Sequence, residues 1–198
     1  KPLAREYSMI NAFRLSIPFI LFLLLLSSGC IRTKRLPVNF SAPNIGVSST
    51  KLDAELKSLT VTVARPDEAT GEINPGIGVH TELWKTALEE AFNRMAIFKD
   101  DSPKKVSLAV KVLKMDTPDF GGEMTTHASA RYEIIDRSNG SIIFTTDIST
   151  SGVVPFDHAF EGVIRARESI NRSVQNNIIQ FLQVLETVEI DKPMFPSS

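Results

Sequence analysis

Cysteine is almost absent from this chain, because Cys30 is the only one among its 198 residues. An internal disulfide is therefore excluded. No excess of charge of either sign is present either: 22 Lys and Arg residues face 23 Asp and Glu residues, for a net charge of −1. This balance argues against a protein that binds nucleic acid through a basic surface. A chain of this length can bury a hydrophobic core without a disulfide or a metal.

Residues that carry chemistry are also few and scattered. The three histidines, His80, His127 and His158, have no second histidine or cysteine at metal-ligand spacing. Ser151 does not lie in a G-x-S-x-G pattern, and the glycines form no phosphate-binding or dinucleotide fingerprint. We therefore expect no catalytic residue, no metal and no cofactor, and a binding or structural role rather than an enzyme. A hydrolase assembled from scattered residues is the least favoured alternative.

One long apolar run is present near the amino terminus. Residues 15–26 read LSIPFILFLLLL, follow Arg14 and precede the small residues 27–29. A membrane-spanning helix needs about 20 residues, whereas a run of this length between a basic residue and small residues is typical of a signal peptide. We predict a signal peptide over 1–29, with translation starting at Met9 because the residues before it add nothing that a signal requires.

The end of this run carries the most specific motif in the sequence. Leu26, Ser27, Ser28, Gly29 and Cys30 resemble the lipobox of bacterial lipoproteins, in which the cysteine thiol receives diacylglycerol. Ser27 departs from the family, which usually has leucine at that position. The one cysteine nevertheless falls at the one place where a lipoprotein requires it. The alternative is an ordinary secretory signal followed by a chance cysteine.

The lipobox resemblance implies a chain that is anchored in the bacterial cell envelope by diacylglycerol and a further fatty acid, such as palmitate, on Cys30. Two or more acyl chains give stable anchoring. Ile31 follows the cysteine, where an aspartate would resemble an inner-membrane retention signal, so we expect the outer membrane, facing the periplasm. The membrane is then the first partner that the sequence implies.

The mature chain divides into three parts. Residues 30–50 contain two prolines and several Asn, Ser and Thr residues without sustained periodicity, which predicts a lipidated cysteine followed by a flexible tether. Residues 51–188 predict one α+β periplasmic domain. Residues 189–198 contain two prolines and are expected to form a disordered tail.

The domain shows four alternating patterns and two helical ones. Strands are predicted over 59–64, 106–112, 125–134 and 142–148, and helices from about Thr81 and from a cap at Asp157 to Leu185. His158 is expected at the start of the last helix, with Phe160 and Val163 on its buried apolar stripe. Asn139-Gly140 predicts the turn of a hairpin between the last two strands. The order is β-α-β-β-β-α. Two helices with one apolar stripe each must share one face of the sheet, so we predict a two-layer sandwich with a mostly antiparallel sheet of about four strands.

Several residues are candidates for contact with a partner. Trp84 is predicted to anchor the core, with an interface aromatic as the alternative. Phe120 and the segment 153–156, which includes Phe156, place apolar residues in predicted loops where a partner could dock. Asn177 falls close to the apolar stripe of the last helix and is either a boundary residue or an asparagine that binds a loop or sheet edge.

The layout of lipobox, tether, strand, helix, three strands and closing helix resembles small envelope lipoproteins of the YajG type. It also resembles the auxiliary lipoproteins of ABC-type lipid transport systems. The resemblance covers about residues 55–187 and depends on element order and on two loose signatures, His80-Thr81-Glu82-Leu83-Trp84 and residues 176–182. It implies a non-enzymatic accessory or adaptor subunit of an envelope assembly for transport, secretion or maintenance, with an envelope protein as partner. The alternative is a lipoprotein that binds a lipid or small ligand between sheet and helices.

Overall fold

The computed structural model of the protein describes residues 38–73, 79–117 and 121–190. Their order along the chain is strand, helix, three strands, a short 3₁₀ turn and a final helix. The elements are β1 (Glu55–Val63), α2 (Thr81–Met95), β2 (Lys105–Asp116), β3 (Met124–Asp136), β4 (Ile142–Val154), η1 (Phe156–His158) and α3 (Gly162–Leu185).

The four strands form one sheet in the order β1-β2-β3-β4. β1 runs parallel to β2, which the intervening helix α2 permits because it carries the chain back to the starting end of the sheet. β2, β3 and β4 are antiparallel neighbours. The predicted hairpin between β3 and β4 is confirmed, and Gly140 adopts φ +75° in its turn, a conformation that glycine takes without strain.

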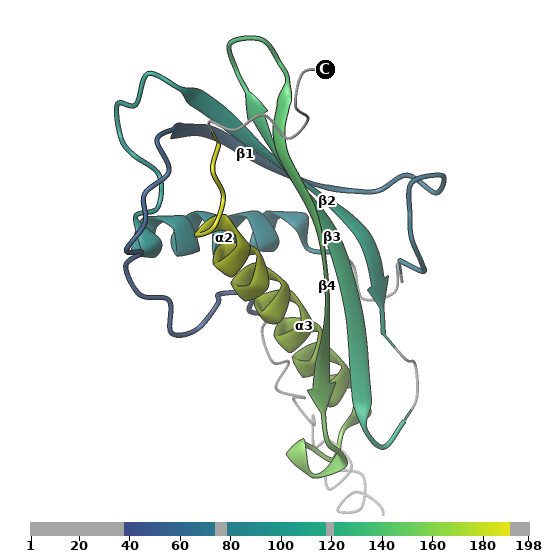
Figure 1. The fold of residues 1–198 in the computed structure, drawn as a ribbon. Helices are drawn as coiled ribbons and strands as arrows, with labels where there is room; N and C mark the ends of the chain where they lie inside the picture. Colours follow the sequence, from purple (N-terminus) through teal and green to yellow (C-terminus); the bar gives the residue numbers. More distant parts are fainter. Residues whose placement is uncertain (1–37, 74–78, 118–120, 191–198) are drawn as a thin grey trace, which may run out of the picture. The chain divides into compact units, whose positions relative to one another are not determined.

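Both helices lie on the same face of the sheet (Figure 1). α2 packs against β1, and α3 packs against β3 and β4. The side chains that alternate inward from the strands meet the apolar stripes of the helices in one core, which includes Leu108, Val110, Tyr132, Leu88 and Phe181. The predicted fold class, an α+β two-layer sandwich with a mostly antiparallel sheet, is confirmed.

The start of the last helix differs from the prediction. α3 begins at Gly162, and Asp157 lies in η1 instead of capping the helix. Ala159 between the two is extended, with φ −160° and ψ 145°, so η1 and α3 are separate elements. Phe160, which was expected on the buried stripe, therefore lies outside the helix and points into solvent.

The segment 38–50 corrects the prediction of a flexible tether over 30–50. Phe40 and Ala42 are buried, and the Phe40 ring meets Trp84 edge-on at 6.2 Å between centroids. The backbone N–H of Asn39 donates to Asn171 Oδ1 at 3.0 Å, and Gln175 Nε2 donates to the carbonyl of Asn39 at 3.0 Å. The two apolar side chains supply the burial energy that the polar composition of the segment concealed. Residues 31–37 lie outside the described residues.

The carboxyl-terminal boundary also shifts slightly. Ile190 is buried, and its carbonyl accepts a hydrogen bond from Lys104 Nζ at 2.9 Å. The packed chain thus extends past 188 into the predicted tail, and residues 191–198 lie outside the described part.

Candidate functional site

The sequence-predicted site residues fall in three different situations. Cys30 and residues 26–29 of the lipobox lie outside the described residues, as does Phe120. Trp84 is fully buried, whereas Phe156 is exposed on η1. Phe156 has the exposure that an interface residue requires, and its interface role stays a prediction.

Trp84 is a core residue, and its alternative role as an interface aromatic is wrong. Its indole lies in the core against Phe40 and contacts the hydroxyl of Tyr132. Burial raises the pKa of Tyr132, and the contact with Trp84 lowers it by less. Because Tyr132 is fully buried, its hydroxyl stays protonated and acts as a hydrogen-bond donor.

The space between sheet and helices is filled by side chains. Tyr132 of β3 and Phe181 of α3 are stacked at 3.9 Å between ring centroids, and Leu88, Leu108 and Ile178 are also fully buried. A ligand between the layers would have to displace these close-packed groups. The packing therefore disfavours an apolar ligand cavity at this position.

A row of polar side chains attaches α3 to the sheet. Asn177 is fully buried; its Oδ1 accepts from the Tyr132 hydroxyl at 2.8 Å, and its Nδ2 donates to the carbonyl of Ile148 at 2.9 Å. One turn away, the Thr150 hydroxyl donates to the carbonyl of Ser173 at 2.9 Å. The interpretation of Asn177 as an asparagine that binds the sheet is thus confirmed, and its role is to position α3.

The same row continues toward the start of α3 as hydroxyl groups. The side chains of Thr117, Thr126 and Ser169 form a buried chain with oxygen–oxygen distances of 3.0 and 2.7 Å. Ser169 also donates to the carbonyl of Ala166 at 2.7 Å. Hydroxyls that satisfy one another in this way can be buried at little cost, so this group is structural and not a nucleophile paired with a base.

The most distinctive surface feature is a cluster of exposed apolar side chains where β4 ends and α3 begins. We call it the apolar tip and define it as Val153, Phe156, Phe160 and Val163, which are 43%, 60%, 93% and 55% exposed. Covering a large apolar side chain is worth about 1.5–3 kcal/mol. Four such residues within 11 positions of the chain make this part of the described surface a candidate for contact with a partner.

The buried side chain of Arg165 binds the backbone of the apolar tip and so fixes its conformation. Its side chain is buried; Nη1 donates to the carbonyls of Ala159 and Phe160, and Nη2 donates to that of Gly121 at 3.0 Å. Its guanidinium also lies over the Phe156 ring, 4.8 Å from the centroid. Arg165, Phe160 and Val163 were not predicted as site residues; Gly162, directly before Val163, was the available signal that the helix begins there.

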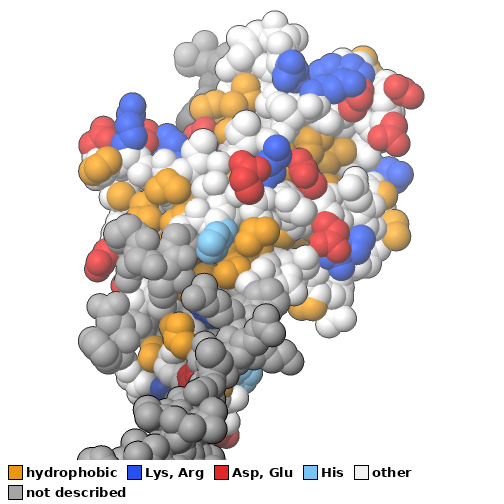
Figure 2. Space-filling view, turned by 180° about the vertical axis from the view of Figure 1, so that it is seen from behind, with side chains coloured by type: hydrophobic (Ala, Val, Ile, Leu, Met, Phe, Trp, Pro, Cys, Tyr) orange, Lys and Arg blue, Asp and Glu red, His pale blue; other side chains and the backbone are white. Residues whose placement is uncertain are grey.

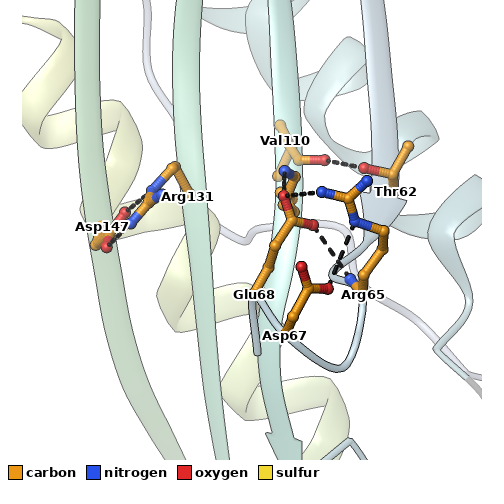
Figure 3. A network of polar contacts seen from close by, with 8 residues as sticks. Thr62, Arg65, Asp67, Glu68, Val110, Arg131 and Asp147 are labelled. Atoms are coloured by element: carbon orange, nitrogen blue, oxygen red, sulfur yellow. Dashed lines mark hydrogen bonds and ion pairs between the residues drawn. The ribbon is translucent and has the colours of Figure 1, made fainter. Parts of the chain in front are cut away.

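The opposite face of the sheet is polar and carries ion pairs. Arg131 of β3 and Asp147 of β4 form a bidentate ion pair at 2.7 and 2.8 Å, and Lys111 of β2 donates to Glu68 at 2.7 Å (Figure 3). Acidic and basic side chains are intermingled over the side of the molecule that Figure 2 shows, and neither sign dominates it.

The Arg131–Asp147 pair predicts a specific dependence of stability on pH. The Arg131 side chain lowers the pKa of Asp147 below its ordinary value of 3.8. Since the folded-state pKa is the lower one, the contribution is complete above the unfolded-state pKa and is lost as the pH falls through the folded-state pKa. Both side chains are over 40% exposed, so solvent screening limits the contribution to about 1 kcal/mol at most.

When the pH falls from 7 to 3, the free energy of unfolding should therefore decrease less in Asp147→Asn than in the wild type. The difference should be up to about 1 kcal/mol. Urea unfolding at the two pH values measures this difference. Asp67→Asn is the control, because Asp67 is 74% exposed and lies 3.6 Å from Arg65 Nε. Equal losses in Asp147→Asn and the wild type would contradict the prediction.

The three histidines lie at three different elements. His80 precedes α2, His127 lies on β3 and His158 lies in η1, not at the start of the final helix as expected. Within the described ranges, no group of three or more His, Cys, Asp or Glu side chains could hold a metal ion. No helix in the same ranges is long and apolar enough to cross a membrane.

No protein-family model and no curated protein sequence matches this chain. Among solved structures, the protein XCC0632 from Xanthomonas campestris, of the family DUF330, is similar with a TM-score of 0.52 and 10% identity over 74% of this chain and 94% of that one. A minor lipoprotein from Acinetobacter baumannii gives a TM-score of 0.42 and 11% identity over 66% of this chain and 93% of that one.

The first of these comparisons defines a class of fold. This chain has an α+β two-layer sandwich similar to that of the DUF330 protein over most of both lengths. The similarity concerns the arrangement of the backbone, since one residue in ten is identical. Function has to be argued from the side chains of this chain.

Proposed function

We propose that this protein is a bacterial envelope lipoprotein, anchored through lipid on Cys30, that works as a non-enzymatic accessory or adaptor subunit of an envelope assembly. The observation that carries the proposal is the position of the only cysteine, directly after the apolar run and the small residues 27–29. The packing of residues 38–50 on the domain, which leaves a shorter tether than predicted, supports the proposal. Eight residues separate Cys30 from Asn39, the first residue that is hydrogen-bonded to α3, so lipid on Cys30 holds the folded domain close to the membrane.

The adaptor role is supported by what the domain offers a partner. Its core is filled, and four of the eight large apolar side chains that are exposed in the described residues belong to the apolar tip. Such a surface suits binding better than chemistry. The finer expectations, a YajG type, an auxiliary role in lipid transport and an outer-membrane position facing the periplasm, belong to this proposal. A lipid carrier is the weaker candidate, because Tyr132 and Phe181 occupy the space that a ligand would need.

The anchor is tested by mass spectrometry of the mature protein from bacterial membranes. We expect a chain that begins at Cys30 and carries diacylglycerol and a third acyl group, and that partitions into the detergent phase. Cys30→Ser is the matched control, because it removes the thiol and should abolish both the added mass and the partitioning. An unmodified wild-type chain that begins at another residue would overturn the anchor.

The adaptor role requires a separate experiment. Tagged wild-type protein, purified from detergent-solubilised membranes, should retain an envelope protein in a stoichiometric amount. Cys30→Ser, at matched expression, should retain less because it is not concentrated at the membrane. A lipidated wild-type protein that retains no stable partner would count against the adaptor role and leave the anchor intact.

A further inference from the structure

The apolar tip is held in place by its surroundings and is not a flexible loop. Arg165 binds the carbonyls of Ala159 and Phe160 and packs on the ring of Phe156. Val153 lies at the end of β4, where it is paired with Thr125 of β3. The side chains of the tip therefore project from fixed backbone at one end of the sheet and of α3.

The length of chain before Asn39 limits where a lipid on Cys30 can lie. Nine residue steps separate Cys30 from Asn39, and an extended chain spans at most about 3.3–3.6 Å per residue, or about 30 Å in total. Asn39 is hydrogen-bonded to Asn171 of α3. The start of α3 at Gly162 is nine residues away along the helix, or about 13 Å. A membrane that holds Cys30 is thus within reach of the apolar tip.

The tether also reaches the other end of α3, so the side chains must select between the two ends. The end near Leu185 carries Val47 and Glu186, and the Ser48 hydroxyl donates to Glu186 there. The apolar tip instead carries two phenylalanines and two valines, of which Val153 lies on the sheet face turned away from α3. Aromatic and aliphatic side chains at one end of a lipid-anchored domain are the chemistry that enters the interface of a bilayer.

We infer that the apolar tip inserts into the surface of the phospholipid bilayer that holds Cys30, so that α3 points its amino-terminal end at the membrane. The inference rests on the proposed anchor and adds an orientation to it. Asp157 and Glu161 flank the tip with negative charge and are exposed, so apolar insertion and not attraction to anionic lipid drives the contact. Binding at the tip should accordingly depend little on salt or on the anionic lipid content.

The test uses the full-length protein, processed in bacteria and purified in its lipidated form. Because the natural cysteine is blocked by lipid, Glu161→Cys provides a single free thiol for an environment-sensitive nitrobenzoxadiazole label beside Phe160. Val47→Cys is the matched control, since Val47 is 77% exposed near the other end of α3. Both proteins are reconstituted into phosphatidylethanolamine and phosphatidylcholine vesicles, with and without spin-labelled acyl chains.

The label at position 161 should gain about twofold in emission and lose more than half of that emission to spin-labelled lipid, whereas the label at position 47 should change little. Adding Phe160→Ser to Glu161→Cys should reduce the quenching while Cys30 keeps the protein on the vesicles. Equal quenching at both positions, or none at 161 in lipidated, vesicle-bound protein, would overturn the inference and leave the anchor standing.

Two other outcomes identify a different cause. An emission change at 161 that depends on protein concentration and not on spin-labelled lipid would assign the tip to a second copy of the chain and overturn the inference. A protein without lipid on Cys30, shown by its mass, would overturn the proposed function and the orientation that rests on it.

Discussion

Gly152→Ala is expected to lower the free energy of unfolding by about 3 kcal/mol or more. A Cβ atom at position 152 would lie 2.1 Å from the carbonyl oxygen of Ser169 and 2.4 Å from the backbone nitrogen of Ser173. Both atoms belong to the backbone of α3, so they cannot move aside as a flexible side chain could. The substitution therefore forces α3 away from β4 and stretches the neighbouring bonds from Thr150 and Asn177 to the opposite element.

Urea unfolding followed by the fluorescence of Trp84 measures this loss, because the single tryptophan is buried in the core. Gly46→Ala is the matched control, since a Cβ there would meet no atom within 4 Å. We expect the control to stay within about 0.5 kcal/mol of the wild type. If the two alanine variants proved equally stable, the close approach of α3 to β4 at Gly152 would be refuted.

The arrangement of the domain could be predicted because its strands and helices follow simple periodicities. Alternation from Val106 to Val112 and from Ala128 to Ile134 showed which side chains face the core. The three- and four-residue spacing from Leu83 to Met95 and from Phe160 to Leu185 placed one apolar stripe on each helix. With helices of one stripe each, the two-layer arrangement follows, since each stripe needs the same sheet face.

The errors in the prediction have a common physical cause: tertiary contacts that leave no periodic pattern. Phe40 and Ala42 are isolated apolar residues in a polar segment, and the segment packs because Asn171 and Gln175 of α3 bind the backbone of Asn39. The partners are more than 130 residues away in the chain. The composition of this segment, taken without its distant partners, therefore predicts a flexible tether.

Val153 and Phe156 of the apolar tip were predicted as a docking surface, whereas Phe160 and Val163 escaped prediction for a different reason. Phe160 and Val163 fit the three- and four-residue spacing of the helix and so were placed on the buried stripe. The helix starts two residues after Phe160, and the segment before it is shaped by Arg165, whose bonds to loop carbonyls have no sequence pattern. Phe160 thus lies in solvent although it matches the helical period, because the helix begins only after it, and Val163 is exposed in the first turn of α3. The lipobox residues 26–30, by contrast, could be read from the sequence alone, since their recognition depends on local order.

α3 connects every part of the molecule on which the functional proposals depend. Its amino-terminal end adjoins the apolar tip, and its middle binds Asn39, close to the point where the described chain begins. Asn177 and Gly152 fix its distance and angle to the sheet. The orientation of the tip relative to the anchor therefore depends on the contact between α3 and β4.

Asn177→Leu is expected to lower the free energy of unfolding by about 3 kcal/mol, although leucine is similar in size to asparagine. It leaves the Tyr132 hydroxyl without its acceptor at 2.8 Å and removes the donor at 2.9 Å from the carbonyl of Ile148. Each buried polar group without a partner costs about 1–3 kcal/mol. Asn176→Leu is the matched control; Asn176 is exposed and makes one bond, to the carbonyl of Ser151, so its loss should be about 1 kcal/mol or less.

Tyr132→Phe separates the hydrogen bond from the packing of the ring. The phenyl group keeps the stacking on Phe181, while Asn177 Oδ1 loses its donor, so we expect a loss of about 1–2 kcal/mol. In the double variant Tyr132→Phe/Asn177→Leu, neither partner of that bond remains, and the combined loss should fall short of the sum by about 1 kcal/mol or more. Strict additivity in urea unfolding would show that the two side chains do not interact, and would assign the loss in Asn177→Leu to the bond with Ile148 on β4 alone.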